Sequence, residues 1–258
     1  TTSDPAAFTI DLQDRGCWNG LTFLNVPAAN PPSRLRWCVL EYSKALPGRG
    51  LDTRVPRVGG VALDGAGGAL RVVGRSPLVV SHCILRHNVA VRRGALAAHY
   101  GAAPLLAGSL WYDNWGLTRT GACLLSYATP RLVHNTVTQN HATNGSSFFP
   151  TGAVDNFHAR TRFLGNIVHG NATAHYDSIQ VLATKAYYCR WNDIGGVSGG
   201  IGAIDADPLW LGTGPTPYVP GPGSPCLDAG DADEALAWLT AEDLAGGARV
   251  SGDEIDLG

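Results

Sequence analysis

Charged residues are scarce in this chain of 258 residues. They make up 16% of it, against roughly 25% in an average globular domain. Hydrophobic residues make up 45%, which is enough for a sizeable core and leaves Gly, Ser, Thr and Asn to cover much of the surface. No run of about 18 apolar residues occurs, so we expect no insertion into a membrane. A signal peptide and an initiating Met are also absent, which indicates a processed or trimmed product.

Acidic residues are nearly missing from the middle of the chain. Residues 34–162 contain 15 Lys or Arg and 5 Asp or Glu, an excess of 10 positive charges, whereas residues 163–258 contain 3 basic and 13 acidic residues. A basic middle attracts polyanions through long-range fields. Arg accounts for 17 of the 19 basic residues, and its fork binds carboxylate and sulfate through two hydrogen bonds. The alternative is that these arginines only line solvated edges.

The six cysteines lack the CxxC and Cys/His spacings of zinc sites. Cys38 and Cys83 lie in the similar settings WCVL and HCIL, which favours buried free thiols that pack as small hydrophobic side chains. An extracellular location would permit disulfides instead, and the candidate pairs are Cys17–Cys38 and Cys189–Cys226.

An internal repeat decides the expected fold. Four segments open with a Gly-Ala pair and close on an Asn, and the closing Asn residues are 26, 26 and 31 positions apart. These segments are 68–88, 94–114, 121–140 and 152–171. Their apolar stretches are three to five residues long and are broken by Gly, Pro or Asn. Such stretches are too short for helices and fit short strands joined by sharp turns.

Stacked coils of this kind place each strand in register with its equivalent in the next coil, which gives parallel sheets around one core. We therefore predict an all-β fold, a right-handed parallel β-helix solenoid of about six coils with a wrapped C-terminal cap. The single domain 1–258 divides into leading strands (1–33), coils (34–196) and a C-terminal closure (197–258). The recurring Asn residues are expected to bond to one another in a structural ladder. They are Asn88, Asn114, Asn140 and Asn171.

The motifs GCWNGLTF and SRLRWCVLEYSKA, followed by coils that open on Gly-Ala and close on Asn, resemble bacterial secreted or surface proteins of the parallel β-helix repeat type, in the pectin-lyase-like superfamily. The tail motifs IDADPLW, GSPCLDAGD and AEDLAGGARVSGDEIDLG resemble the C-terminal closure of such proteins. The resemblance covers residues 9–258. It implies a secreted or cell-surface location and a fragment of a longer surface protein. It implies no single function, because this fold carries lyases, hydrolases and non-enzymatic adhesins.

The residues offer little for catalysis. A glycoside hydrolase needs two carboxylates on one face, and no acidic residue lies between Asp64 and Asp113, so we do not expect a hydrolase. A polysaccharide lyase needs a cation that neutralises a uronate carboxylate and a base that removes the neighbouring proton. If the chain is a lyase, the candidates for these roles are His99, Arg92 and Arg71.

The repeat also aligns residues of neighbouring coils. His99 and Tyr100 follow their opening Gly by five and six residues, as Ser126 and Tyr127 do one coil later. The spacing predicts that His99 and Ser126 share one column and that the tyrosines share another. Because adjacent residues of a strand face opposite sides, an inner aromatic stack is favoured for the tyrosines over a role as a lyase base.

Histidines and aspartates do not indicate a metal centre. All eight His fall between His82 and His175 without an HxH or HxxxH pair, and isolated surface histidines explain them better. Asp205 and Asp207 leave calcium open as a ligand, but their place in the tail motif favours a turn. We expect no metal site and no other cofactor.

The segment LWYDNWG (110–116) is the best clue to binding, because aromatic faces with a polar handle suit sugar rings. Trp111 is expected to point inward, like Leu85 and Val137 at the same offset from Asn, which leaves Tyr112 and Trp115 exposed. Packing within the protein is the equally supported alternative for this set. The residues that we assign to ligand binding are Arg71, Arg75, Arg92, Arg93, Tyr112 and Trp115.

Two functions remain. The first is an extracellular, non-catalytic β-helix module, an adhesin or surface protein whose Arg-rich coils contact an acidic polysaccharide or another cell-surface glycan. The second is a polysaccharide lyase that cleaves a uronate-containing glycan by β-elimination. The missing catalytic constellation favours the first, and nucleic acid is not expected as a partner.

Overall fold

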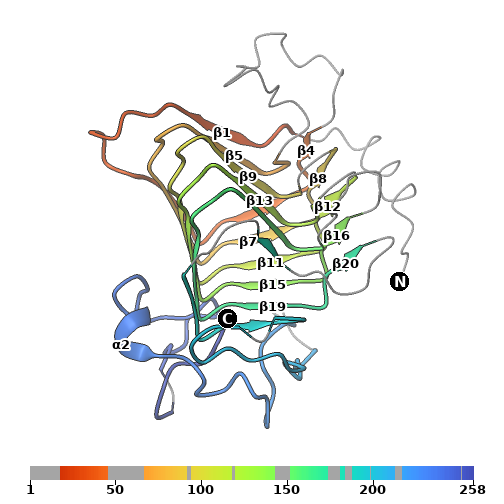
Figure 1. Cartoon of the computed structure of the whole chain (residues 1–258), viewed down its shortest axis with the longest axis vertical. Helices are drawn as coiled ribbons and strands as arrows, with labels where there is room; N and C mark the ends of the chain where they lie inside the picture. Colours follow the sequence, from red (N-terminus) through yellow and green to blue (C-terminus); the bar gives the residue numbers. More distant parts are fainter. Residues whose placement is uncertain are drawn as a thin grey trace.

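The computed structural model describes residues 18–45, 67–91, 94–117, 120–142, 152–173, 181–183, 188–197, 199–212, 217–250 and 252–258. Within them the chain forms an all-β parallel β-solenoid of about four turns, in which equivalent strands lie one above another (Figure 1). Four regular turns run from 70 to 173. Strands on either side of them correspond to the two degenerate coils among the six that the sequence predicts.

Each strand pairs in parallel with the strands one turn before and after it, so that four sheets form. Sheet 1 contains β1 (Leu21–Leu24), β5 (Leu70–Val73), β9 (Leu96–His99), β13 (Cys123–Ser126), β17 (Val154–Phe157) and β21 (Val181–Ala183). Sheet 2 contains β2 (Ser33–Arg36), β6 (Leu78–Ser81), β10 (Leu105–Ala107), β14 (Arg131–Val133), β18 (Arg162–Leu164) and β22 (Tyr188–Arg190). Sheet 3 contains β3 (Val39–Glu41), β7 (Ile84–Arg86), β11 (Leu110–Tyr112), β15 (Thr136–Thr138), β19 (Ile167–His169) and β23 (Asp193–Ile194). Sheet 4 contains β4 (Lys44–Ala45), β8 (Val89–Ala90), β12 (Trp115–Gly116), β16 (His141–Ala142) and β20 (Ala172–Thr173).

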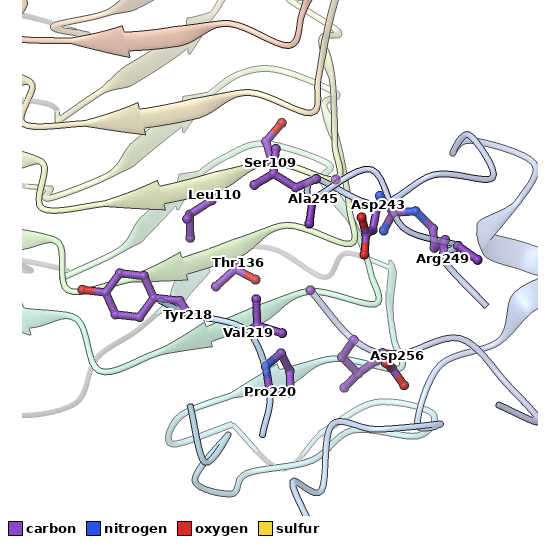
Figure 2. Close-up of a pocket in the computed structure, with 15 residues that line it drawn as sticks. Ser109, Leu110, Thr136, Tyr218, Val219, Pro220, Asp243, Ala245, Arg249 and Asp256 are labelled. Carbon is purple, nitrogen blue, oxygen red and sulfur yellow. The ribbon is translucent and has the colours of Figure 1, made fainter. Parts of the chain in front are cut away.

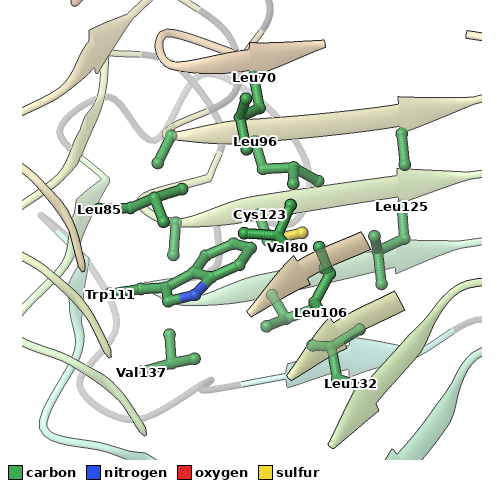
Figure 3. Packing of buried hydrophobic residues seen from close by; sticks show 14 of the residues in the cluster. Leu70, Val80, Leu85, Leu96, Leu106, Trp111, Cys123, Leu125, Leu132 and Val137 are labelled. Atoms are coloured by element: carbon green, nitrogen blue, oxygen red, sulfur yellow. The ribbon is translucent and has the colours of Figure 1, made fainter. Parts of the chain in front are cut away.

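One core runs through the stack and is filled by alternate residues of sheets 1, 2 and 3 (Figure 3). Trp111 is 1% exposed in this core. It pairs with Leu85 and Val137 in the neighbouring turns, as their common offset from Asn predicts. Full burial of a side chain such as Leu85 contributes about 2 kcal/mol, so the stacked apolar columns supply most of the stability.

A residue in the left-handed backbone region turns the chain at each of three corners, with φ between 47° and 77°; after Tyr100 a second one follows, Gly101, with φ of 85°. Outside glycine this conformation is uncommon, and Asn, Asp and His are enriched in it, which accounts for many of the residue types found there. Corner 1/2, between sheets 1 and 2, contains Asn25, Gly74, Tyr100, Tyr127 and His158. Corner 2/3 contains Trp37, His82, Gly108, His134, Gly165 and Trp191. Corner 3/4 contains Tyr42, His87, Asp113, Gln139, Gly170 and Gly196.

The residue after the corner residue points inward, and at corner 3/4 it builds the predicted Asn ladder. Asn114 Nδ2 donates to Asn140 Oδ1 at 2.8 Å, and Asn140 Nδ2 donates to Asn171 Oδ1 at 2.8 Å. A second ladder, which the repeat analysis missed, follows corner 2/3. There Asn135 Nδ2 donates to Asn166 Oδ1 at 3.0 Å, and Asn166 continues to Asn192 at 2.9 Å.

The described cysteines are free thiols, so the candidate disulfide Cys189–Cys226 is wrong. Of the other candidate pair, Cys38 is free and Cys17 lies outside the described residues. Cys83 is fully buried beside Cys38 in the core. This arrangement confirms the prediction of thiols that pack as small hydrophobic side chains. Burial raises the pKa of the Cys83 thiol to about 11, which keeps it protonated and unreactive near neutral pH.

The C-terminal part of the chain packs on the outer faces of sheets 2 and 3. Leu239 contacts the outer side of sheet 2 at Ala107, Val133 and Leu164. The short helix α2 (Ala232–Ala235) precedes this contact and is capped by the side chain of Asp231. No helix among the described residues is long and apolar enough to cross a membrane.

Candidate functional site

Two of the three residues assigned to a lyase site, Arg71 and His99, lie where the surface is closed. Arg71 in β5 is 6% exposed and donates through Nη2 to the backbone oxygen of Asn19. His99 in β9 is 1% exposed and faces the same outer side of sheet 1. Arg92, like the predicted ligand-binding residue Arg93, lies outside the described residues.

The predicted columns of sheet 1 are confirmed, but the tyrosines stack elsewhere than expected. His99 pairs with Ser126. The rings of Tyr100 and Tyr127 are 6.3 Å apart and differ by 1° in orientation. They occupy corner 1/2 and not the core, and Tyr127 is 52% exposed. Left-handed corner residues direct their side chains outward here, so the inner stack is wrong and an outer stack, extended by His158 at 5.2 Å, takes its place.

The prediction that Trp115 is exposed together with Tyr112 is also wrong, because only 4% of Trp115 is exposed. Its ring stacks on His141 at 4.1 Å. Tyr112 is half-buried on the outer face of sheet 3, where its hydroxyl accepts a hydrogen bond from Arg86 Nη1 at 2.9 Å. Arg86 Nε in turn donates to Glu41 at 2.7 Å, so the positive charge on this wall is neutralised locally.

Arginines without a carboxylate partner gather on a different wall. Among the described residues, six arginines on sheet 2 and beside corner 1/2 form no ion pair, and five of the six are exposed. We call this set the arginine wall. It consists of Arg34, Arg36, Arg75, Arg131, Arg160 and Arg162. Arg75 is therefore the one predicted arginine that the structure places on an open, basic surface.

Two members of the arginine wall are held in register. Arg131 and Arg162 pair across adjacent strands, an arrangement in which like charges destabilise a sheet. Aromatic rings support both guanidinium groups: Arg131 lies 4.6 Å from the Trp238 ring and Arg162 lies 5.4 Å from the Tyr188 ring. A guanidinium stacked in this way keeps its edge available for an anion.

A carboxylate with two histidines occupies corner 3/4. Asp113 Oδ2 lies 2.8 Å from His87 Nδ1, and Asp113 Oδ1 lies 3.7 Å from His141 Nε2. The indole of Trp115 donates to the same carboxylate at 3.1 Å. Burial raises the pKa of Asp113, but the hydrogen bond and charge of His87 outweigh it, so the pKa lies below its ordinary value. This corner therefore holds an ionised carboxylate that orients an imidazole.

Sequence reasoning missed this cluster, and the expectation of isolated surface histidines is wrong. His82, His99 and His134 are each no more than 2% exposed, while His87 and His141 meet at Asp113. The signal was present, because His87 and Asp113 are 26 residues apart and each immediately precedes a ladder Asn. The 26-residue spacing that aligns Asn88 with Asn114 therefore also aligns the residues before them, His87 and Asp113.

Of the two candidate calcium ligands, Asp207 forms a turn, as favoured, whereas Asp205 bonds to a residue nine positions earlier in the chain. Asp205 Oδ1 accepts from the backbone N–H of Gly196 at 3.0 Å, and Asp207 Oδ1 accepts from that of Leu209 at 3.0 Å. Within the described ranges, no group of three or more His, Cys, Asp or Glu could hold a metal ion.

A pocket of about 170 Å³ lies between the outer face of sheet 3 and the C-terminal segment (Figure 2). Leu110 and Thr136 form its floor, and residues 218–220 and 243–249 form two of its sides. Arg249 lines it with only 6% of its surface exposed. Comparisons of the chain with models of protein families, with curated proteins and with solved structures found no match.

Proposed function

We propose that this chain is an extracellular, non-catalytic β-solenoid module that binds an acidic polysaccharide along the arginine wall. The observation that carries the proposal is the in-register pair Arg131–Arg162, which places two positive charges on adjacent turns without an ion-pair partner among the described residues. Like charges in register cost stability, and an anionic ligand relieves that cost.

The geometry of the wall suits a polymer. Strands of successive turns are about 4.8 Å apart, so Arg131 and Arg162 present two cations one strand spacing apart along the solenoid axis. Arg34 lies in the same column, separated from them by Val79 and Leu105. The outer stack of Tyr100, Tyr127 and His158 runs beside them at corner 1/2. Tyrosines with exposed hydroxyl ends pack on sugar rings and donate hydrogen bonds to them. A secreted or bacterial cell-surface adhesin matches such a surface.

Binding to immobilised polygalacturonate, alginate and heparin, with dextran as the neutral control, tests this proposal. The double variant Arg160→Gln/Arg162→Gln removes two unpaired charges, and we expect it to weaken binding at least tenfold, because a charge-assisted hydrogen bond contributes about 1.5–3 kcal/mol. The matched control Arg86→Gln/Arg190→Gln removes two arginines that have carboxylate partners. It should change binding less than twofold. Equal losses in both variants would overturn the assignment of the wall.

The alternative is a polysaccharide lyase that acts on a uronate-containing glycan by β-elimination. The observation in its favour is the imidazole of His87, oriented by Asp113 at 2.8 Å. Incubation with alginate and polygalacturonate should leave the ultraviolet absorbance unchanged. A rise from unsaturated product that disappears in Asp113→Asn would replace the binding function by the lyase function.

For the architecture we infer a right-handed solenoid whose C-terminal closure shields the open end of the core, related to secreted parallel β-helix proteins of the pectin-lyase-like kind. Support comes from the handedness of parallel crossover connections, which is right-handed in about 98% of cases, and from the need of solenoids for polar end caps. An experimental density map of the chain decides both points.

A further inference from the structure

The pocket beside sheet 3 is bounded by parts of the chain that are far apart in sequence. Leu110 and Thr136 project outward from β11 and β15, and Val219 faces them from the C-terminal segment (Figure 2). Asp243 and Arg249 stand on the side next to corner 2/3. The pocket therefore combines an apolar floor with a charged flank.

Arg249 is the unusual residue of this pocket. Its Nε donates to the backbone oxygen of Glu242 at 3.3 Å, but its buried Nη2 has no hydrogen-bond partner among the described residues. Within the same part of the chain no carboxylate lies within 4.0 Å of its guanidinium. Burial lowers the pKa of Arg249 despite the more distant charge of Asp243. A buried guanidinium without a counter-charge is costly.

The neighbours of Arg249 accommodate the guanidinium without neutralising it. Gly108 leaves the space for it, because a Cβ at that position would lie 2.6 Å from Arg249 Nη2. His82 and His134 flank this gap in corner 2/3, and burial lowers the pKa of each. Both are therefore neutral near pH 7 and provide no anion for the arginine.

The two carboxylates of the pocket are engaged by backbone groups. Asp243 Oδ1 accepts from the N–H of Gly247 at 2.7 Å, and Asp256 Oδ1 accepts from the N–H of Asp228 at 2.8 Å. The remaining lining is largely apolar and includes Leu110. A cavity of about 150 Å³ with apolar walls holds benzene, so this pocket of about 170 Å³ has room for a ring or a short aliphatic chain.

We propose that the pocket binds a small organic carboxylate, with the carboxylate at Arg249 Nη2 and the apolar body between Leu110 and Val219. This site lies on sheet 3 and does not depend on the arginine wall. A carboxylate satisfies the orphaned N–H and supplies the missing counter-charge, and the apolar lining selects against inorganic anions.

Benzoate is a suitable probe and benzyl alcohol its neutral counterpart of nearly the same size. We expect saturable binding of benzoate to the whole chain in titration calorimetry, with benzyl alcohol at least tenfold weaker. Inorganic phosphate should not compete. Absence of benzoate binding, or equal affinity for benzyl alcohol, overturns the proposal.

Variants place the ligand within the pocket. Val219→Trp fills the space beside Leu110 and keeps Arg249, and it should weaken benzoate binding at least tenfold. Val250→Trp is the matched control, because Val250 is also exposed but does not line the pocket. Arg249→Lys keeps the charge and loses the fork, so an intermediate loss is expected. Unchanged binding in Val219→Trp locates the ligand elsewhere and refutes the assignment, whatever the polysaccharide assays show.

Discussion

At corners 2/3 and 3/4 the chain turns in the same way. One residue in the left-handed region is followed by an inward residue, and the inward residues of successive turns form an Asn ladder. The outer sides differ. The C-terminal segment covers corner 2/3, where His82 Nε2 lies 2.9 Å from the Glu242 carbonyl and His134 Nδ1 lies 3.0 Å from that of Asp256. At corner 3/4, Asp113 retains a side-chain exposure of 34%.

This difference shows that the left-handed backbone conformation selects the residue type at a corner. Whether the C-terminal segment packs over that corner then decides how far the side chain is buried and what it contacts. His134 is completely buried, which lowers its pKa to about 3 and makes it a neutral anchor for the C-terminal segment. His87 occupies the equivalent position of the next corner and instead faces the carboxylate of Asp113. A histidine favoured by the same turn is a buried anchor at one corner and a partly exposed partner of a carboxylate at the other.

Glycine substitutions should separate the two corners most strongly. Gly165 and Gly170 belong to the same turn and have φ of +65° and +67°. A Cβ at Gly165 would lie 2.1 Å from His134 Nε2, whereas the nearest atoms to one at Gly170 would be Gln139 Nε2 at 3.2 Å and Thr138 Oγ1 at 3.4 Å. We expect Gly165→Ala to cost about 4 kcal/mol, from left-handed strain plus overpacking, and Gly170→Ala about 1 kcal/mol, from strain alone. Urea unfolding measures both values. Equal losses of unfolding free energy in the two variants would contradict a role of the C-terminal segment that packs over corner 2/3.

Substitutions in the two Asn ladders should cost similar free energies of unfolding. Both ladders lie inside the solenoid, whereas the C-terminal segment packs on the outer faces of sheets 2 and 3. Asn140→Ala and Asn166→Ala each leave buried backbone carbonyls without their donor, among them those of Trp111 and Leu132. We expect a loss of about 3 kcal/mol in each, again from urea unfolding. Gln139→Asn, at an exposed corner position, serves as the control with little change. A difference of more than about 2 kcal/mol between the two Asn variants would show that the ladders are not equivalent.

Acid should weaken corner 2/3 more than corner 3/4. His134 is completely buried, whereas His141 at corner 3/4, whose pKa burial also lowers, is only partly buried and faces the carboxylate of Asp113. The pKa of His134 lies near 3 in the folded chain, below its ordinary value of 6.5, so the unfolded chain binds the additional proton and stability falls as the pH drops below 6.5. The slope is about 1.4 kcal/mol per pH unit, or about 2 kcal/mol at pH 5. Asp113 has a lowered pKa, so its contribution is lost only below about pH 4. Unfolding between pH 7 and pH 5 should show the slope, and His134→Asn should reduce it. An undiminished slope in the variant would assign it to other groups.

The smallest effect is expected from the indole at corner 3/4. Trp115→Phe keeps a ring beside His141 and removes the hydrogen bond to Asp113 Oδ1. We expect a loss of about 1 kcal/mol above pH 5, together with a rise in the pKa of Asp113. Carboxyl chemical shifts in an NMR titration report that pKa. An unchanged pKa would mean that the indole contributes nothing to the charge of this corner.

The repeat predicted the solenoid, the first ladder and the inward orientation of Trp111, because all three follow from periodicity. The second ladder escaped notice since its members, Asn135, Asn166 and Asn192, begin only in the third regular turn; Ser109 and Cys83 occupy the earlier positions. Trp115 was misplaced because it packs with Val89 and Leu117 outside the main core, a contact that the repeat does not predict. The corner tyrosines were misplaced because of their backbone conformation. Alternation of faces holds within a strand and fails at a left-handed corner residue.

Sequence by itself determined the parallel stack, because short apolar stretches at a fixed spacing can be buried only by stacking on their own copies. The same is true of the local excess of arginine. Only the tertiary structure decided which arginines lack a carboxylate, which histidines are buried and where the C-terminal segment leaves a pocket around Arg249. These features depend on contacts between residues as far apart as His82 and Glu242, and the pairing of such distant segments leaves no period in the chain.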